Sequence, residues 1–281
     1  MSGARITIGI PCYNDHRFVA DAVRSVQEDE PVEIVVVDDG SDDPRAIEAL
    51  SRLPELGARL VRREVNAGLG AARNTLLAEA RTPYLFNLDS DDLGIPGRFA
   101  AMADRLDADP AAVVCYGGYE EFGAHSSIRD APSWLDPFRL AWISEYPPSA
   151  MWRVEPIRAV GGWPEAPQSQ AIYEDWRLWA TLSRERMPTV YLGRGVPSYR
   201  RRLHGESQLS LVRRRHRAAW LDIHRHHPEL LRNLRRNRRL TDLPLTRQLV
   251  FPIFYGPRPR FGFEPKVRFW LERHGVRTAS S

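Results

Sequence analysis

The sequence predicts an α/β protein built around a mostly parallel sheet. Two observations carry this prediction: short apolar runs alternate with longer segments of helical period, and polar or acidic residues directly follow the apolar runs. Such alternation is typical of βαβ units, in which helices flank a parallel sheet. Of the 281 residues, 43% are hydrophobic and 27% are charged, so the chain can bury a core and carry an appendage.

The first half of the chain supplies the expected strands and helices in order. The apolar runs expected to form strands are residues 6–11, 34–37, 59–62, 84–88 and 113–116. The segments of helical period between them are residues 18–27, 44–53, 71–80 and 97–107. Ligands of such sheets bind at the carboxyl ends of the strands, so we expect functional residues in the loops that follow them.

The second half of the chain is less regular. Residues 132–148 are rich in proline and aromatic residues, which predicts an irregular loop region. An ordered stretch follows, with Gly161-Gly162-Trp163 and a helix around residues 174–182. Beyond residue 211 the chain is helical in pattern and strongly basic to about residue 240. We therefore expect a main domain over residues 1–210 and a basic helical extension over residues 211–281.

Charge and cysteine content restrict the class of protein. Residues 1–199 hold 20 Lys and Arg against 30 Asp and Glu, whereas residues 200–281 hold 20 against 6, so the two parts differ in electrostatic role. Cys12 and Cys115 lie in apolar runs, which favours neither a disulfide framework nor a zinc site. No leader pattern and no apolar run of about 20 residues is present. We expect a cytoplasmic protein without a transmembrane segment, whose contact with any membrane is peripheral.

Acidic residues follow two of the expected strands. Asp89 and Asp91 come after residues 84–88, where two carboxylates can share a divalent cation and a ribose, because Mg²⁺ and Mn²⁺ prefer oxygen ligands. The alternative is a turn that caps the helix beginning near Pro96. Asp38 and Asp39 follow residues 34–37, where a carboxylate can accept hydrogen bonds from a base or a ribose. Receiver domains of phosphorelays carry paired acids too, so this pair is ambiguous by itself.

A Gly-x-Gly segment, Gly68-Leu69-Gly70, follows the third expected strand. A dinucleotide fingerprint would follow the first strand and keep a small residue where Arg73 stands, so that interpretation is weak. The segment instead predicts a tight turn that opens a helix, whose N-terminal amides and Arg73 can face an anion. The alternative for Arg73 is an ordinary surface position on a helix.

Six segments, taken together and in order, resemble the inverting family 2 glycosyltransferases with the GT-A fold. The resemblance covers residues 5–210, and its segments are residues 8–14, 37–41, 66–74, 87–92, 161–163 and 174–176. It implies an α/β GT-A fold, with a nucleotide-binding, mostly parallel sheet flanked by helices, over residues 1–210. It gives no guidance for the basic helical C-terminal appendage. The sequence departs from the family pattern at Pro164. In the family, an acid commonly follows the segment that corresponds to Gly161-Gly162-Trp163.

The resemblance also implies roles for individual residues. Pro11, Tyr13 and Asp39 match the nucleobase pocket, Arg73 a phosphate or base-side contact, and Asp89 the acid that holds the ribose. Asp91 matches the acid that holds a divalent metal, Mn²⁺ or Mg²⁺, and His204 a late histidine that often completes that site. The alternative for His204 is a structural histidine. Asp175 matches the catalytic base, and Glu174 beside it is a candidate for contact with the acceptor or the sugar. Trp163 and Trp176 are candidates for the same contacts as a sugar platform, with core packing as the alternative.

An inverting transfer needs one base on the far side of the anomeric carbon from the departing diphosphate. Asp175 at a helix start suits this role, and an ordinary aspartate with a pKa of about 3.9 suffices if the acceptor proton moves late. The alternative is that Asp175 only caps its helix. The predicted function is therefore metal-dependent transfer of a sugar from a nucleotide diphosphate sugar, UDP- or dTDP-linked, to a hydroxyl or amine of a small-molecule, glycan or lipid-linked acceptor.

The basic C-terminal block leaves other function classes open. Residues 213–217 and 232–239 are rich in arginine, which suits phosphates of a nucleic acid, anionic lipids, or a solvated face that packs on the acidic domain or forms a homodimer. We favour the solvated face over nucleic acid or lipid, because charge runs are usually solvated. The rival functions are a nucleotidyltransferase, which would release pyrophosphate from a nucleoside triphosphate, and a degenerate transferase fold that only binds nucleic acid or a membrane surface.

Overall fold

The computed structural model describes residues 3–165, 174–203 and 209–257. The chain divides into two compact units. The first unit comprises Met1–Leu135 and Glu145–Ser207, and the second comprises Asp136–Ser144 and Gln208–Ser281. A short internal segment therefore belongs with the C-terminal helices, which no feature of the sequence indicated.

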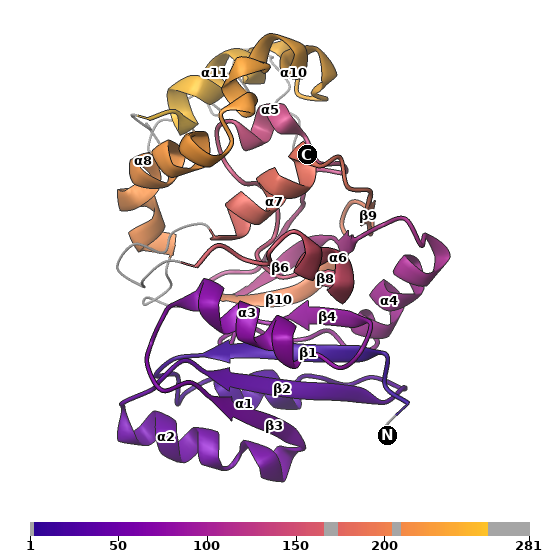
Figure 1. Cartoon of the computed structure of the whole chain (residues 1–281), viewed down its shortest axis with the longest axis vertical. Coiled ribbons are helices and arrows are strands. Elements are labelled where there is room, and N and C mark those ends of the chain that lie inside the picture. Colours follow the sequence, from indigo (N-terminus) through magenta and orange to yellow (C-terminus); the bar gives the residue numbers. More distant parts are fainter. Residues whose placement is uncertain (1–2, 166–173, 204–208, 258–281) are drawn as a thin grey trace. The chain divides into compact units, whose positions relative to one another are not determined.

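A seven-stranded sheet, counted over the described residues, forms the centre of the first unit in the order β3-β2-β1-β4-β8-β5-β9 (Figure 1). Its strands are β1 (Ile6–Cys12), β2 (Val32–Asp38), β3 (Ala58–Arg62), β4 (Tyr84–Asn87), β5 (Val114–Tyr116), β8 (Met151–Arg153) and β9 (Thr189–Tyr191). Neighbouring strands are parallel except at β8, which runs antiparallel to β4 and β5. The prediction of a mostly parallel sheet is confirmed.

The four helices predicted in the first half are present, with α1 ending at Arg24 rather than at residue 27. The helices of the first unit are α1 (Val19–Arg24), α2 (Pro44–Ser51), the 3₁₀ helix η1 (Leu53–Leu56), α3 (Leu69–Glu79), α4 (Arg98–Ala108), α6 (Val154–Ala159) and α7 (Glu174–Arg184). Helix α2 begins where Pro44 occupies the first turn and the Asp43 carboxylate accepts a hydrogen bond from the Arg45 amide.

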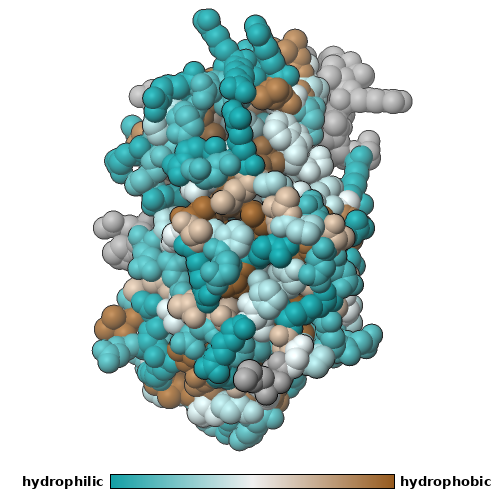
Figure 2. All heavy atoms as spheres, turned by 45° about the vertical axis from the view of Figure 1, so that its right-hand side comes forward, coloured by the Kyte–Doolittle hydropathy of each residue, from teal (hydrophilic) through white to brown (hydrophobic). Residues whose placement is uncertain are grey.

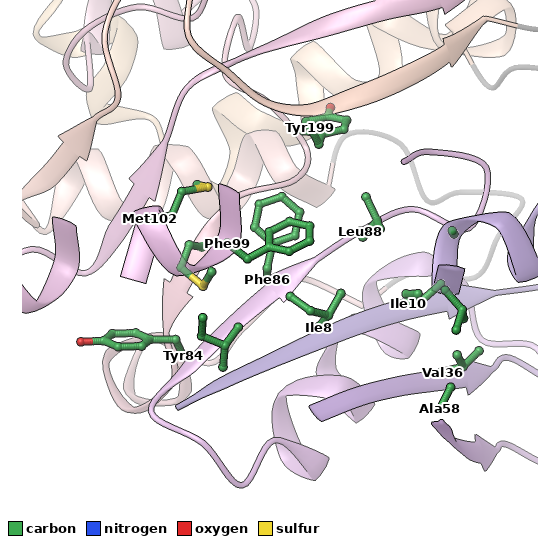
Figure 3. Close-up of a cluster of buried hydrophobic side chains, with 14 of the residues drawn as sticks. Ile8, Ile10, Val36, Ala58, Tyr84, Phe86, Leu88, Phe99, Met102 and Tyr199 are labelled. Carbon is green, nitrogen blue, oxygen red and sulfur yellow. The ribbon is translucent and has the colours of Figure 1, made fainter. Parts of the chain in front are cut away.

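The central strand β1 is buried on both faces. Ile8 and Ile10 pack with residues of α1 and α4 in the cluster drawn in Figure 3, where Phe86 and Phe99 meet with ring centroids 4.6 Å apart. Because side chains alternate along a strand, Gly9 faces the other way, and a Cβ there would lie 3.0 Å from a methyl of Leu76 in α3. Helices on both faces therefore explain why this strand has almost no polar residues.

Strand β8 was not predicted, because it is only three residues long and follows an irregular segment. The buried amide of Asn87 at the end of β4 holds it in place. Asn87 Nδ2 donates to the Pro148 carbonyl at 2.7 Å, and Asn87 Oδ1 accepts from Trp152 Nε1 at 2.5 Å. A side chain at the end of a predicted strand thus fixes a neighbour from a distant part of the sequence.

A second, three-stranded sheet among the described residues consists of β10 (Pro197–Leu203), β6 (Gly118–Gly123) and β7 (Ser127–Arg129), in the order β10-β6-β7. Strands β6 and β10 are parallel, whereas β6 and β7 form an antiparallel pair. An isolated bridge between Leu93 and Arg200 brings β10 next to the segment that follows β4. The acidic residues after β4 therefore lie beside this small sheet.

The described part of the second unit is helical. Its described helices are α5 (Pro137–Leu140), α8 (Leu209–His226), α9 (Glu229–Arg232), α10 (Leu234–Leu240) and α11 (Leu245–Tyr255). Asp136 begins α5 by accepting a hydrogen bond from the Phe138 amide at 2.8 Å, and Trp142 stacks on Trp220 of α8 with ring centroids 6.4 Å apart. Across the described residues, no helix has both the length and the apolar composition that crossing a bilayer requires.

Candidate active site

The loops that follow β1, β2 and β4 meet at one edge of the main sheet. Cys12 at the end of β1 pairs with Asp38 at the end of β2. The Ser90 hydroxyl donates to the Asp15 carboxylate at 2.9 Å, which ties the loop after β4 to the loop after β1. Parallel strands that end together bring Tyr13, Asp39 and the acids after β4 to the same edge, as the sequence predicted.

Asp39 is almost completely buried beneath the turn that precedes α3. Its carboxylate accepts hydrogen bonds from the amides of Ala67 at 3.3 Å and Gly68 at 2.8 Å, and it pairs with Arg63 Nε at 2.8 Å. Burial raises the pKa of Asp39, while these donors and the arginine oppose the rise. Asp39 thus holds the Gly68 turn in place, and its predicted contact with a nucleobase stays a prediction.

Arg73 forms a buried ion triad with Asp89 and Glu174. Its side chain is 1% exposed; one terminal nitrogen donates to Asp89 Oδ1 at 2.8 Å, and the other donates to Glu174 Oε1 at 2.8 Å. The triad joins α3, the end of β4 and the start of α7, which lie up to 101 residues apart in sequence. The sequence predicted a phosphate or base contact for Arg73, but its described partners are two carboxylates of the site itself.

A signal for this triad is present in the sequence. Arg73 stands on the apolar stripe of its helix, one turn from Leu69 and Leu76. A cation on a buried stripe must have acidic partners, because an unpaired buried charge is costly. The sequence could therefore have indicated a buried pair, although not which two acids complete it.

Asp175 is the second residue of α7, next to Glu174, so the predicted helix start is confirmed. Burial and, after it, the negative charge of Glu174 raise the pKa of Asp175 to about 7, although the positive charge of Arg73 opposes the rise. This pKa differs from the ordinary value of about 3.9 that the sequence predicts for the residue. Its surroundings therefore favour the protonated form of Asp175 more than water does.

Asp89, Asp91 and Asp92 concentrate negative charge after β4. Asp92 is buried and accepts a hydrogen bond from the Arg202 amide at 2.8 Å, and its pKa is raised well above the usual value by burial and by the charges of Asp91 and Asp89. Arg202 Nε donates to the Asp91 carbonyl at 2.9 Å, and its guanidinium lies 4.4 Å from the ring centroid of Phe18. Sequence reasoning missed Arg202, whose signal was its place in the Arg200-Arg201-Arg202 run of β10.

The donor chemistry at this edge suits a hard divalent cation. Carboxylate oxygens are the ligands that Mg²⁺ and Mn²⁺ prefer, and nucleotide sites often use one or two carboxylates with phosphate oxygens as the rest. Within the described ranges, no group of three or more His, Cys, Asp or Glu is arranged to enclose a metal by itself. The predicted role of Asp91 as a metal ligand stays a prediction. His204 lies outside the described residues.

The Gly-x-Gly segment and the Gly161-Gly162-Trp163 segment pack against each other at α3. Asn74 Oδ1 accepts from the Trp163 amide at 2.8 Å, and Asn74 Nδ2 donates to the Trp163 carbonyl at 2.8 Å. A Cβ at Gly162 would lie 2.4 Å from Asn74 Oδ1, and one at Gly70 would lie 2.4 Å from the Pro164 carbonyl oxygen. Close backbone approach explains the glycine at position 70, and the predicted contact of this helix start with an anion stays a prediction.

The two candidate platform tryptophans lie inside the protein. Trp163 is 1% exposed and Trp176 is 0% exposed, and Trp163 packs edge-on against Trp152 with ring centroids 5.5 Å apart. Both indoles therefore pack in the core, which is the alternative to a sugar platform, because a buried ring offers no face to a sugar. Tyr13 is half-buried, and Pro11 is buried at the end of β1.

Comparisons with known proteins show the family of the chain. Residues 7–161 match the sequence model of the family described as "Glycosyl transferase family 2". The succinoglycan biosynthesis protein ExoO of Rhizobium meliloti (strain 1021) is 38% identical over 112 residues, which are 39% of this chain and 32% of that protein. The uncharacterized glycosyltransferase EpsJ of Bacillus subtilis (strain 168) is 29% identical over 119 residues, which are 41% of this chain and 34% of that protein. The chain thus spans about a third of the length of the curated relatives it matches.

Solved structures share the fold at low sequence identity. Residues 1–349 of S. aureus TarS, in complex with UDP-GlcNAc, align with a TM-score of 0.60 and 17% identity over 95% of this chain and 77% of that chain. The mannosyltransferase PcManGT from Pyrobaculum calidifontis, in complex with GDP-Man and Mn²⁺, aligns with a TM-score of 0.55 and 19% identity over 88% of this chain and 68% of that chain. These likenesses confirm the predicted GT-A type of α/β fold. Because the family's sequence model matches more than half of the chain, the chain belongs to glycosyl transferase family 2.

Proposed function

We propose that the protein is a metal-dependent inverting glycosyltransferase. It would transfer a sugar from a nucleotide diphosphate sugar, UDP- or dTDP-linked, to a hydroxyl or amine of a small-molecule, glycan or lipid-linked acceptor. The observation that carries the proposal is the environment of Asp175. Its raised pKa suits a general base. Its neighbour Glu174 pairs with Arg73, which also pairs with Asp89 after β4. Family membership and the nucleotide sugars bound in the similar structures support the donor class.

The donor would bind where the strands of the main sheet end. Pro11 and Tyr13 flank the nucleobase, and Asp89 accepts hydrogen bonds from the ribose. A carboxylate offers about four lone-pair positions. The described partners of Asp39 use three of them, so it can still accept from a base N–H. Arg73 then acts as a positioning residue, because it orients Asp89 and Glu174 rather than touching the donor.

Asp91 would hold the divalent metal, together with oxygens of the diphosphate, and His204 remains a candidate for completing the site. When bound, the metal lowers the energy of the departing diphosphate by neutralising part of its charge. Arg202 fixes the backbone of Asp91 from the side of β10, so it orients this carboxylate without binding the metal itself.

The chemistry at the acceptor follows from the place of Asp175. The acceptor oxygen or nitrogen forms a bond to the anomeric carbon from the side opposite the diphosphate, while the carbon–oxygen bond to the diphosphate breaks and its electron pair leaves with the phosphate oxygen. The acceptor proton moves to the Asp175 carboxylate. A base with a pKa near the working pH accepts this proton and then releases it to water. Glu174 stands beside the base and can accept a hydrogen bond from the sugar or the acceptor.

The melting temperature of the full chain tests the proposal. It is measured with UDP, dTDP, GDP and CDP, each with and without Mn²⁺. A ligand that binds only the folded state raises this temperature with its affinity. We expect UDP or dTDP to stabilise the protein, and to do so more strongly with Mn²⁺. Product analysis of the preferred sugar nucleotide then separates transfer, which releases a nucleoside diphosphate, from nucleotidyl transfer, which releases pyrophosphate. Absence of stabilisation by every diphosphate, with and without metal, would rule out the proposed donor site.

A further inference from the structure

We propose that the second unit docks on anionic lipid membranes through a mixed apolar and cationic surface. We call this surface the α10–α11 face; it consists of Leu240, Leu245, Leu249, Ile253, Arg232, Arg235, Arg236 and Arg239. The inference does not depend on the proposed function, because it concerns helices outside the candidate active site.

The apolar part of the α10–α11 face is a stripe along α11. Leu245, Leu249 and Ile253 are spaced four residues apart, which places them on one side of the helix, and they are 65%, 56% and 53% exposed. The other side of α11 is packed: Phe251 is 1% exposed and contacts Phe138 of α5 with ring centroids 6.3 Å apart. The helix therefore has one side in the core of the unit and a second apolar side facing solvent.

Exposed apolar residues gather in this unit rather than scattering over the chain. Among the described residues, eight large hydrophobic side chains are exposed, and five of them belong to the second unit: Leu221, Leu240, Leu245, Leu249 and Ile253. Isolated exposed hydrophobic residues are normal on protein surfaces, whereas a continuous group indicates an interaction site. Figure 2 shows hydrophobic side chains beside protruding hydrophilic ones over the helices of this unit.

The cationic part of the face lies on α9 and α10. Arg232, Arg235, Arg236 and Arg239 are exposed, and none of them forms an ion pair with an acid in the part of the chain that the structure describes. Arg238 Nε donates to Gln248 Oε1 at 3.3 Å, which holds α10, the helix that carries three of these arginines, beside α11, the helix that carries the leucine stripe. Residues 228–257 contain six arginines and two acids, and one of these acids, Asp242, pairs with Arg139 at 2.8 Å.

This combination fits an anionic lipid surface better than other partners. Leucine and isoleucine side chains can enter the boundary between headgroups and acyl chains while neighbouring arginines contact lipid phosphates. A solvated charged face, which the sequence favoured, accounts for the arginines but not for the exposed stripe. A symmetric dimer through this face would set one cationic surface against its own copy, which is unfavourable. A nucleic acid would use the arginines and gain little from the stripe.

Co-sedimentation of the full chain with vesicles tests the proposal. We expect the wild-type chain to pellet with vesicles of phosphatidylcholine and phosphatidylglycerol, and much less with phosphatidylcholine alone. The cationic variant, Arg235→Gln/Arg236→Gln/Arg239→Gln, should lose about a hundredfold in partition, since each near-surface cation is worth about fivefold. The apolar variant, Leu245→Ser/Leu249→Ser/Ile253→Ser, should also lose binding, and added salt should not restore it.

Two matched variants in the first unit serve as controls. Ile47→Ser/Val65→Ser/Ile128→Ser removes three side chains that are 38%, 68% and 53% exposed, and Arg24→Gln/Arg45→Gln/Arg52→Gln removes three exposed arginines. Both should bind anionic vesicles like the wild type. Circular dichroism and thermal unfolding verify that every variant is folded.

Several results would overturn the proposal. One is equal binding of the wild type to neutral and anionic vesicles, and another is an equal loss in the control variants. A third is a lipid-free dimer that the apolar variant dissociates, because the face would then belong to a second copy. A fourth is tight binding of single-stranded RNA that the cationic variant loses and the apolar variant keeps, with no binding to vesicles.

Discussion

At the scale of single residues, we expect the decrease of kcat/KM at low pH, the acid limb of the pH profile, to reflect the protonation of Asp175. Because burial raises its pKa to about 7, the carboxylate is protonated at lower pH and cannot take the acceptor proton. We expect kcat/KM to fall about tenfold per pH unit below that value. Asp175→Asn should lower transfer by about 10² to 10⁴ while leaving nucleoside diphosphate affinity unchanged. Steady-state kinetics and calorimetry measure these quantities, and normal turnover in the variant would remove Asp175 as the base.

Arg73 offers a residue-scale test of the buried triad. Arg73→Met leaves the carboxylates of Asp89 and Glu174 without their shared cation, which should cost about 3 kcal/mol in the free energy of unfolding. The positive charge of Arg73 also lowers the pKa of Asp175, so its removal should move the acid limb of activity to higher pH.

Arg59 provides the control for that experiment. It pairs with Glu33 at 3.1 Å and Glu79 at 2.6 Å, away from the edge that carries Asp175. Arg59→Met should therefore destabilise the protein without moving the pH profile. If both variants leave the acid limb unchanged, Arg73 has only a structural role.

The predicted metal site can be tested at a single residue, Asp91. Asp91→Asn should abolish the increase in nucleoside diphosphate affinity that Mn²⁺ produces, while affinity without Mn²⁺ stays the same. Loss of even an outer partner of a metal ligand costs about 10- to 100-fold in affinity, so we expect at least this for Asp91. Calorimetry with and without Mn²⁺ measures the difference. An undiminished metal effect in the variant would place the metal elsewhere.

At the scale of elements, the contact between α3 and the Gly161-Gly162-Trp163 segment can be tested with a pair of glycines. Both have positive φ, 89° at Gly161 and 67° at Gly162, so alanine strains the backbone at either position. Only at Gly162 would the added Cβ collide with Asn74, whereas nothing lies within 4 Å at Gly161. We expect Gly161→Ala to cost about 1 kcal/mol and Gly162→Ala clearly more. Chemical denaturation measures the loss in free energy of unfolding of each variant. Equal losses would show that the Asn74 side chain moves aside at little cost.

At the scale of the whole molecule, Asp175 should make stability depend on pH. Its folded-state pKa is raised, so the folded state binds this proton more tightly than the unfolded state, whose pKa is about 3.9. The stability contribution of the group is fully present below about pH 4 and is lost as pH rises through about 7. Asp175→Asn lacks this titration, so it should be more stable than the wild type at pH 8 and gain little at pH 4.5. Thermal unfolding at the two pH values checks this, and a difference independent of pH would contradict the raised pKa.

The sequence by itself determined the α/β class, the order of the first strands and helices, and the edge where the acidic residues gather. These features follow from local rules: apolar periodicity specifies strands and helices, and parallel strands end together. The same local rules placed Asp175 at a helix start.

Only the tertiary structure decided the pairing of Arg73 with Asp89 and Glu174, the insertion of β8 through Asn87, and the raised pKa of Asp175. It also joined residues 136–144 to the C-terminal helices and exposed the leucine stripe of α11. The physical reason is distance along the chain. Burial, ion pairing and exposure depend on groups brought together from far apart in sequence, and no local pattern specifies which partners will meet.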